Sequence, residues 1–263
     1  MPTEKIFIQS RNNQKIAVLL DKTENQKGLA FVMHGLGGFK EQKHLQAMTE
    51  AFLEEGFTVV RFDTRDSFGE SEGNYENASI TSYYQDLEDL IKWSKDQPFY
   101  QEPFYLAGHS LGGISVGTYA ERFPDKIKGV APISPVVSGK LHLEKKKKYN
   151  PERLAEQDRT GWRINESKSK PGLIKKLRWH QFKEDLLKYD LIAEADKLTM
   201  PVLIIVEEND TSTIPEQQKL LFDAIPGNHK ELHIIKGAPH TFREPEHLTE
   251  IKDIFKKWIK KTN

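Results

Sequence analysis

The sequence has 263 residues, and its 39 Lys and Arg residues are balanced by 39 Asp and Glu residues, so the formal net charge is zero. A neutral chain has no bulk electrostatic attraction to nucleic acid or to an anionic membrane, and we expect neither as a partner. There is no cysteine, which excludes disulfides, thiolate metal sites and a cysteine nucleophile.

The N-terminus leads into a short strand-like run at residues 6–8 rather than into the apolar core of a secretory signal. No stretch approaches the roughly 18 apolar residues of a membrane span. We therefore expect a cytoplasmic protein, monomeric or homodimeric, although a mature form that has lost its signal would read the same.

Short apolar runs alternate with longer amphipathic runs, which is typical of a mostly parallel sheet covered by helices. The first two strands are too close for a helical crossover, so a hairpin turn at residues 11–13 and an antiparallel edge are expected. The prediction is an α/β protein with an eight-stranded, mostly parallel sheet flanked by helices. The expected strands are 5–10, 15–21, 28–34, 58–63, 103–108, 127–134, 201–207 and 230–235, and the expected helices are 41–55, 82–96, 111–123, 215–224 and 245–260.

About 60 polar residues separate the sixth strand from the seventh, and a structureless loop of that length is unusual in a compact domain. We predict that residues 138–198 form an inserted cap, largely helical in its second half, and that residues 1–137 and 199–263 form the core. Trp162 and Trp179 lie in this segment. They either line a pocket for an acyl or aryl group or anchor the cap to the core, and both alternatives stay open.

A run of four lysines, residues 145–148, lies within the predicted cap. Such a run could attract an anionic substrate, but in a neutral chain we expect a solvated face. The sequence has no P-loop, no dinucleotide-binding fingerprint and no metal-ligand spacing of His and Cys, so we expect no cofactor and no metal.

The strongest motif is Gly108-His109-Ser110-Leu111-Gly112, placed between an expected strand and an expected helix. A sharp turn from strand to helix projects the serine hydroxyl from the sheet edge, and the two glycines leave room for the turn. The pentapeptide alone is also found in ordinary glycine-rich turns, but its position between strand and helix favours a nucleophile. Ser110 is therefore the candidate nucleophile.

Serine needs a general base, and nine histidines compete for that role. His240 lies in the loop between the last strand and the last helix, at the strand end where open α/β sheets build their sites. The other histidines considered lie on expected strands and helices or beside them, where surface or packing roles are expected: His44, His229, His233 and His247.

An acid must orient the imidazole, and Asp210 follows the seventh strand at its carboxyl end. Glu207 and Glu208 are rivals, but Glu207 still lies close to the strand, so we prefer Asp210. After the sixth strand no acid occurs before Glu144, which disfavours that placement.

The negative oxygen of a tetrahedral intermediate needs preorganised donors. The backbone N–H of Leu111 follows the nucleophile directly. The segment His34-Gly35-Leu36-Gly37-Gly38 follows the third strand, and we expect its donor to be the Leu36 N–H. We expect His34 to hold this loop rather than act as a base.

These motifs together resemble an α/β-hydrolase of the carboxylesterase kind over essentially the full chain. The order Ser110, Asp210, His240 is that of the family. The size and the single predicted cap are similar to those of bacterial feruloyl esterases and monoacylglycerol-lipase-like enzymes. The loop at residues 63–71 departs from the pattern, because the family usually has a glycine near Asp66.

The resemblance implies hydrolysis of a small-molecule ester through an acyl-enzyme on Ser110, with His240 as base and Asp210 ionised throughout. Peptidase, thioesterase and acyltransferase activities use the same triad and stay open. A non-catalytic binding protein on the same scaffold is the alternative from another class, and retention of all three residues argues against it.

Overall fold

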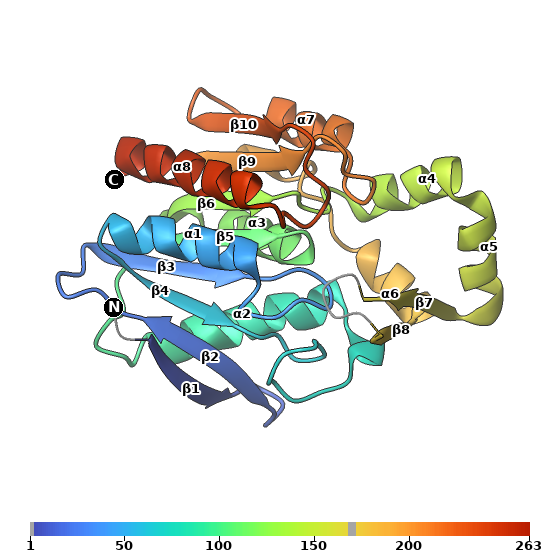
Figure 1. The fold of residues 1–263 in the computed structure, drawn as a ribbon, viewed down its shortest axis with the longest axis horizontal. Coiled ribbons are helices and arrows are strands. Elements are labelled where there is room, and N and C mark those ends of the chain that lie inside the picture. The colour runs from blue at the N-terminus through green and yellow to red at the C-terminus, as the bar shows by residue number, and fades with distance from the viewer. Residues whose placement is uncertain (1–2, 168–171) are drawn as a thin grey trace.

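The computed structural model describes residues 3–167 and 172–263, and its centre is an eight-stranded sheet (Figure 1). The strand order is β1-β2-β4-β3-β5-β6-β9-β10. The strands are β1 (Thr3–Gln9), β2 (Lys15–Asp21), β3 (Gly28–Met33), β4 (Phe57–Phe62), β5 (Phe104–His109), β6 (Ile127–Ile133), β9 (Val202–Glu207) and β10 (Lys230–Ile235). Each predicted strand is present, with bounds within two residues of those expected.

The mixed character of the sheet is confirmed. β1 pairs antiparallel with β2, which pairs antiparallel with β4, and the other neighbours pair parallel. Asn13 has a φ of 56° in the turn between β1 and β2, a left-handed conformation that asparagine tolerates. The central strands therefore end at one common edge, where loops from distant parts of the sequence meet.

Two layers of helices bury both faces of the sheet (Figure 1). Along β3, Phe31 and Met33 pack into one apolar cluster, while Ala30 and Val32 pack into the other. This two-sided burial explains why the central strands read as continuous apolar runs. One face carries α1 (Lys43–Glu54) and α8 (Pro245–Thr262), and the other carries α2 (Ile80–Ser94), α3 (Leu111–Arg122) and α7 (Pro215–Ala224).

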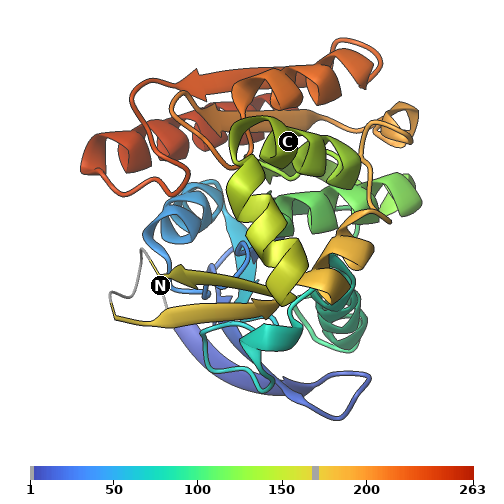
Figure 2. The same ribbon diagram turned by 90° about the vertical axis from the view of Figure 1, so that its right-hand side faces the viewer.

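The segment between β6 and β9, residues 138–198, is called the insert below. It contains α4 (Gly139–Tyr149), α5 (Pro151–Thr160), the antiparallel pair β7 (Trp162–Glu166) and β8 (Ile174–Arg178), and α6 (Trp179–Leu186). It lies beyond the carboxyl ends of the strands, at the opposite end from the termini, and faces the viewer in Figure 2.

The prediction that the insert is helical mainly in its second half was wrong. Two helices fill most of its first half, the strands β7 and β8 lie around its middle, and only the short helix α6 and a 3₁₀ turn follow. The polar α4 and α5 bury few side chains, so they show no broad apolar stripe in the sequence. The hairpin strands are short and charge-rich, and only Leu177 is buried along β8. A short polar pair of this kind gives almost no hydrophobic alternation to detect.

The loop after β4 shows why Asp66 can stand where the α/β-hydrolase pattern usually has a glycine. Asp66 has a φ of 59°, the left-handed conformation in which glycine is favoured and aspartate is tolerated. The Asp66 carboxylate accepts a hydrogen bond from the Asn74 N–H at 2.7 Å. The side chain thus stabilises a backbone conformation that glycine would otherwise adopt.

A buried ion pair joins the loops that follow β3 and β4. Lys40 is fully buried, and its Nζ lies 2.7 Å from Asp63 Oδ2 and 2.7 Å from Glu70 Oε2. Burial lowers the pKa of Lys40, but hydrogen bonds to Asp63, Glu41 and Glu70 outweigh burial and raise the net pKa above its usual range.

No helix in the described ranges is long and apolar enough to cross a membrane.

Replacing Lys40 by methionine should destabilise the fold by about 3–5 kcal/mol, because the buried Asp63 carboxylate would lose its partner. Urea unfolding measures the change. The matched control is Lys22→Met, which breaks an exposed pair with Glu4 and should cost about 0–1 kcal/mol. Equal effects of the two variants would contradict the role given to the buried pair.

Candidate active site

Ser110 occupies the turn between β5 and α3 with a φ of 55° and a ψ of −111°. A non-glycine residue in such a conformation costs on the order of 1–3 kcal/mol and persists only when its surroundings fix it. The Ser110 N–H donates to the Ile133 carbonyl of β6 at 2.8 Å. The turn is thereby held on the neighbouring strand.

The glycines around Ser110 are required by close backbone contacts. A Cβ at Gly108 would lie 2.4 Å from the Gly112 carbonyl oxygen, and a Cβ at Gly112 would lie 2.5 Å from the His34 carbonyl oxygen. Real Cβ atoms do not approach backbone atoms so closely. The glycines therefore allow β5, α3 and the loop after β3 to meet.

The structure brings Ser110, His240 and Asp210 together. His240 Nε2 lies 3.2 Å from Ser110 Oγ, and His240 Nδ1 lies 2.7 Å from Asp210 Oδ2. Asp210 follows β9, and His240 lies between β10 and α8. Asp210 is buried, whereas the His240 side chain is partly exposed. The arrangement can move a proton from the serine hydroxyl to an imidazole that is oriented by a carboxylate.

Asp210 is held as a carboxylate by its own loop. Its Oδ1 accepts hydrogen bonds from the N–H groups of Ser212 at 2.6 Å and Thr213 at 3.0 Å, and its Oδ2 accepts from the Thr213 hydroxyl at 2.6 Å. Burial raises the pKa of Asp210, but the hydrogen bonds from His240 and Thr213 and the His240 charge lower it more, so the net pKa lies well below its usual range. The group is therefore ionised at neutral pH.

The rival acids lie elsewhere. Glu207 is the last residue of β9, fully buried, and hydrogen bonds with the Ser134 hydroxyl. Burial raises its pKa to about 8. Glu208 accepts a hydrogen bond from the Gly237 N–H at 2.9 Å. Neither carboxylate hydrogen bonds with His240 Nδ1, the position that Asp210 occupies.

His34 serves the loop after β3. It is fully buried, its Nδ1 donates to the Gly35 carbonyl at 2.8 Å, and its Nε2 accepts from the Thr64 N–H at 3.0 Å. Both ring nitrogens are thus committed to backbone groups. This agrees with a loop-holding residue.

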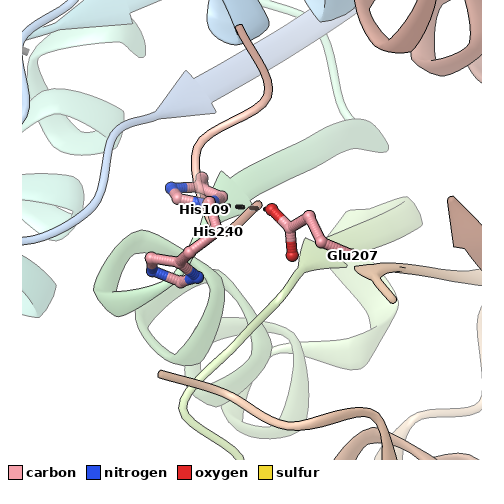
Figure 3. Close-up of side chains that lie close together, drawn as sticks. All are labelled: His109, Glu207 and His240. Atoms are coloured by element: carbon pink, nitrogen blue, oxygen red, sulfur yellow. Dashed lines mark hydrogen bonds and ion pairs between the residues drawn. The ribbon is translucent and has the colours of Figure 1, made fainter. Parts of the chain in front are cut away.

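His109 was not singled out from the sequence. Its Nε2 lies 2.9 Å from the His240 carbonyl oxygen and 3.7 Å from Glu207 Oε1 (Figure 3). Burial lowers the pKa of His109 to about 4. A neutral imidazole that donates to the His240 carbonyl fixes the backbone of the loop that carries His240. The position between Gly108 and Ser110 was the available signal, but its partner became visible only in three dimensions.

His109, Glu207 and His240 also offer one ligand atom each within 4.8 Å of one another. Two imidazoles and a carboxylate can bind a divalent metal. Here His240 directs its two nitrogens to Ser110 and Asp210, and His109 donates Nε2 to a backbone carbonyl. We therefore assign the three groups to hydrogen bonding.

The loop after β3 lies against the nucleophile. A Cβ at Gly35 would lie 3.0 Å from Ser110 Cβ. The Gly37 N–H donates to the Tyr83 hydroxyl at 3.1 Å, a contact from α2 that the sequence did not reveal. Within the described ranges, the N–H groups of Leu36 and Leu111 donate no hydrogen bond, so both are available to an incoming oxygen.

The two tryptophans of the insert differ in environment. Trp179 is fully buried in the core cluster, and its Nε1 donates to Asp158 Oδ1 at 2.7 Å. Trp162 is partly buried, with Lys176 Nζ 3.8 Å from its ring centroid. Trp179 thus packs the insert onto the core. The ring of Trp162 is covered by a cation of its own hairpin.

The expectation of a solvated lysine face was wrong for half of the run. Lys145 is buried and Lys146 is partly buried, while Lys147 and Lys148 are exposed. Lys145 Nζ donates to the Thr211 and Ser212 carbonyls, each at 2.7 Å. These acceptors, in the loop that begins at Asp210, draw the lysine inward.

Comparison with known proteins gives a family. A family model described as serine aminopeptidase, S33 matches residues 24–246. A curated relative from Escherichia coli, described as an uncharacterized 31.7 kDa protein in the traX-finO intergenic region, is 26% identical over 265 residues, covering 89% of this chain and 90% of that protein.

Solved structures share the fold. Est1E from Butyrivibrio proteoclasticus, solved with bound ferulic acid, has a TM-score of 0.79 at 22% identity and covers 98% of both chains. Mouse alpha/beta hydrolase domain-containing protein 10 has a TM-score of 0.80 at 18% identity, covering 99% of this chain and 100% of that one. The esterase domain of a Rhodothermus marinus protein has a TM-score of 0.71 at 18% identity, covering 99% of both chains.

The buried Glu207 should make stability depend on pH. Because its pKa rises from an ordinary 4.5 to about 8, the native state keeps a proton that the unfolded chain releases across that interval. Stability should therefore fall as the pH rises from about 5 to 8 and level off above it. Urea unfolding of Glu207→Gln should show a smaller fall across this range than the wild type. Glu208→Gln, with an exposed side chain, is the control, and equal slopes in all three proteins would refute the prediction.

Proposed function

Because the chain belongs to the serine aminopeptidase S33 family of α/β hydrolases, we propose that it cleaves small carboxylic esters through an acyl-enzyme on Ser110. The observation that carries the proposal is the hydrogen-bonded series from Ser110 Oγ through His240 to the buried Asp210 carboxylate. The strained turn at Ser110 supports it, because it points the hydroxyl away from the sheet toward the partly exposed imidazole.

In the proposed mechanism, His240 Nε2 removes the Ser110 proton as Oγ attacks the ester carbonyl carbon. The C=O π electrons move onto the oxygen, which binds the N–H groups of Leu36 and Leu111. The tetrahedral intermediate collapses, the bond to the alkoxy oxygen breaks, and His240 returns the proton to the leaving alcohol. Water then repeats the sequence on the acyl-enzyme and releases the acid.

Asp210 orients and stabilises the general base, His240. Its carboxylate accepts a hydrogen bond from the N–H of His240 Nδ1, so that Nε2 presents a lone pair to the serine. When His240 becomes an imidazolium, the nearby negative charge stabilises it. Asp210 itself stays ionised, because three donors of its own loop satisfy its oxygens.

We propose that the insert is a cap over this site, with residues 138–198 as cap and residues 1–137 and 199–263 as core. Its position beyond the carboxyl ends of the strands supports this (Figure 2). So do the contacts of Lys145 with the Thr211 and Ser212 carbonyls and of Lys175 with the Gly37 carbonyl, at 3.3 Å. We do not assign Trp162 and Trp179 to substrate binding.

An aminopeptidase activity, as the family description names, is the second candidate. A free peptide N-terminus is a cation, and its recognition requires a negative or acceptor-rich pocket. Near the site, Lys145 and Lys175 present positive charge, while Asp210 is committed to His240. This charge distribution favours esters over peptides with a free amino terminus. Est1E was solved with ferulic acid and the Rhodothermus neighbour is described as an esterase domain, and these similarities support the proposal of an ester substrate.

Ser110→Ala should abolish labelling by a fluorophosphonate probe and reduce turnover of p-nitrophenyl esters to near background, because it removes the hydroxyl that lies 3.2 Å from His240 Nε2. Gel fluorescence and release of p-nitrophenol measure the two effects. Ser115→Ala, in the same helix, is the control and should keep the label. Unchanged turnover in Ser110→Ala would refute the proposed function, and absence of label in the wild type would favour a non-catalytic binding protein.

Asp210→Asn should lower kcat by about 10⁴, because an amide favours the histidine tautomer with Nε2 protonated, which cannot accept the serine proton. Steady-state kinetics on the same ester should show a small change in KM beside the large loss in kcat. The control Asp223→Asn removes an exposed carboxylate that pairs with Lys219, and it should keep full activity. A loss below tenfold in Asp210→Asn would indicate that another acid orients His240.

A further inference from the structure

Four basic side chains of the insert lie within electrostatic reach of one another, and we call them the cationic roof: Lys145 and Lys146 of α4, Arg163 of β7 and Lys175 of β8. Lys146 Nζ donates to Gln157 Oε1 at 2.9 Å and lies 4.1 Å from the centroid of the Trp179 ring. Within the described ranges none of the four forms an ion pair with a carboxylate. The chain as a whole is neutral, so these unpaired charges reflect local placement rather than composition.

Two members of the roof contact the loops of the candidate site directly. Lys145 Nζ donates to the carbonyls of Thr211 and Ser212, which follow Asp210. Lys175 Nζ donates to the Gly37 carbonyl at 3.3 Å, next to the Leu36 amide. The roof therefore lies above both the acid loop and the loop that faces Ser110.

The geometry of the hairpin places Arg163 on the same side as Lys175. Arg163 pairs across the strands with Leu177, which is fully buried, and Lys175 lies two residues before Leu177 on the same face. The intervening Lys176 and the next residue, Arg178, are exposed, and both pair with Glu76. Glu76 thus neutralises the cations on the outer face of the hairpin, whereas no carboxylate among the described residues neutralises Arg163 and Lys175 on the inward face.

Arg163 makes no hydrogen bond or ion pair with any residue that the structure describes. Burial, followed by the nearby charge of Arg163, lowers the pKa of Lys146 to about 7 and that of Lys175 to about 8. Burial lowers the pKa of His142 as well, and both Arg163 and His240 add to that effect. His142 therefore lies within the electrostatic reach of both the roof and the candidate base.

A buried or half-buried guanidinium with no partner is costly unless an anion offsets its charge. The nearby acids of the site do not supply one. Asp210 is bound to His240, and Glu207 lies behind His109 with its carboxyl protonated at neutral pH. Glu76 serves the outer face of the hairpin. Among the described residues, no carboxylate therefore neutralises Arg163.

We propose that the roof binds an anionic group of the substrate, so that the preferred esters carry a carboxylate at a distance from the carbonyl that Ser110 attacks. Arg163, with its planar fork of donors, is the main contact, and Lys175 adds charge. The proposal rests on the proposed ester hydrolysis and specifies its substrate class. The carboxylate can belong to the acyl part or to the alcohol part, and the test separates the two.

The test compares each of two anionic esters with its neutral methyl ester. On the acyl side, mono-p-nitrophenyl adipate is compared with methyl p-nitrophenyl adipate, and on the alcohol side, 4-acetoxybenzoate with methyl 4-acetoxybenzoate. In at least one pair, kcat/KM should be about tenfold higher for the anion, equivalent to about 1.4 kcal/mol, and added salt should reduce the ratio. No preference for the anion in either pair would overturn the proposal.

Substitutions in the roof test which side chains cause the preference for anionic esters. Arg163→Gln should lower the ratio of anionic to neutral kcat/KM by about tenfold, and Lys175→Gln should lower it in the same direction. Arg163→Lys should restore part of it. The control Lys147→Gln removes an exposed charge of α4 and should leave the ratio as in the wild type. A ratio that survives both Arg163→Gln and Lys175→Gln would overturn the proposal.

Labelling of Ser110 by a neutral fluorophosphonate distinguishes failure of the anion-binding roof from failure of the proposed ester hydrolysis. A labelled wild type that hydrolyses neutral esters without preferring anions overturns the roof as a substrate site and leaves the proposed function intact. A wild type that is neither labelled nor active overturns both. Labelling of each variant also reports that its catalytic loops are folded.

Discussion

The left-handed backbone at Ser110 is the constraint on which the rest of the site depends. Two loops clamp it. On one side, Gly112 contacts the His34 carbonyl and Gly35 contacts Ser110 itself. On the other, the Ser110 N–H binds the Ile133 carbonyl, and the next strand end repeats the bend, with Ser134 at a φ of 43°. The strain is maintained because four parallel strands (β3, β5, β6 and β9) fix these loops relative to one another.

The same strand edge holds two neighbouring carboxyl groups in different charge states. Asp210 lies in a turn that supplies donors, so its pKa falls, while Glu207 lies three residues earlier at the buried strand end, and burial raises its pKa to about 8. One group can balance an imidazolium, and the other adds no negative charge near it at neutral pH. Environments that push two pKa values apart in this way assign separate roles to similar side chains.

Sequence reasoning anticipated the features that local patterns encode. The buried strands are apolar runs of the right length, α8 has a clear apolar stripe, and the turns after β3, β5, β9 and β10 place Leu36, Ser110, Asp210 and His240 at one edge. The catalytic roles of these residues remain predictions. What the sequence could not reveal depends on contacts between distant segments, such as those of His109 with the His240 carbonyl and of Tyr83 with Gly37.

The insert was the least predictable part for a related reason. Its helices and hairpin are too polar to bury an apolar face, so neither periodicity nor composition indicates how they pack. The inward turn of Lys145 requires knowing that two free carbonyls face it from the acid loop. A lysine run has the same sequence whether water or a protein loop solvates it.

The anchoring of the insert gives its charges a defined position. The buried Trp179 and Asp185 of α6 attach it to the core, and Asp185 accepts hydrogen bonds from the Thr81 N–H and hydroxyl at the start of α2. The hairpin leads directly into α6, so the rigid contact at Thr81 orients β8 and its cations over the loop that faces Ser110. Attachment through apolar packing and neutral donors leaves the inward cations unneutralised. The polar character of the insert is therefore compatible with a fixed position, which the proposed discrimination between substrates requires.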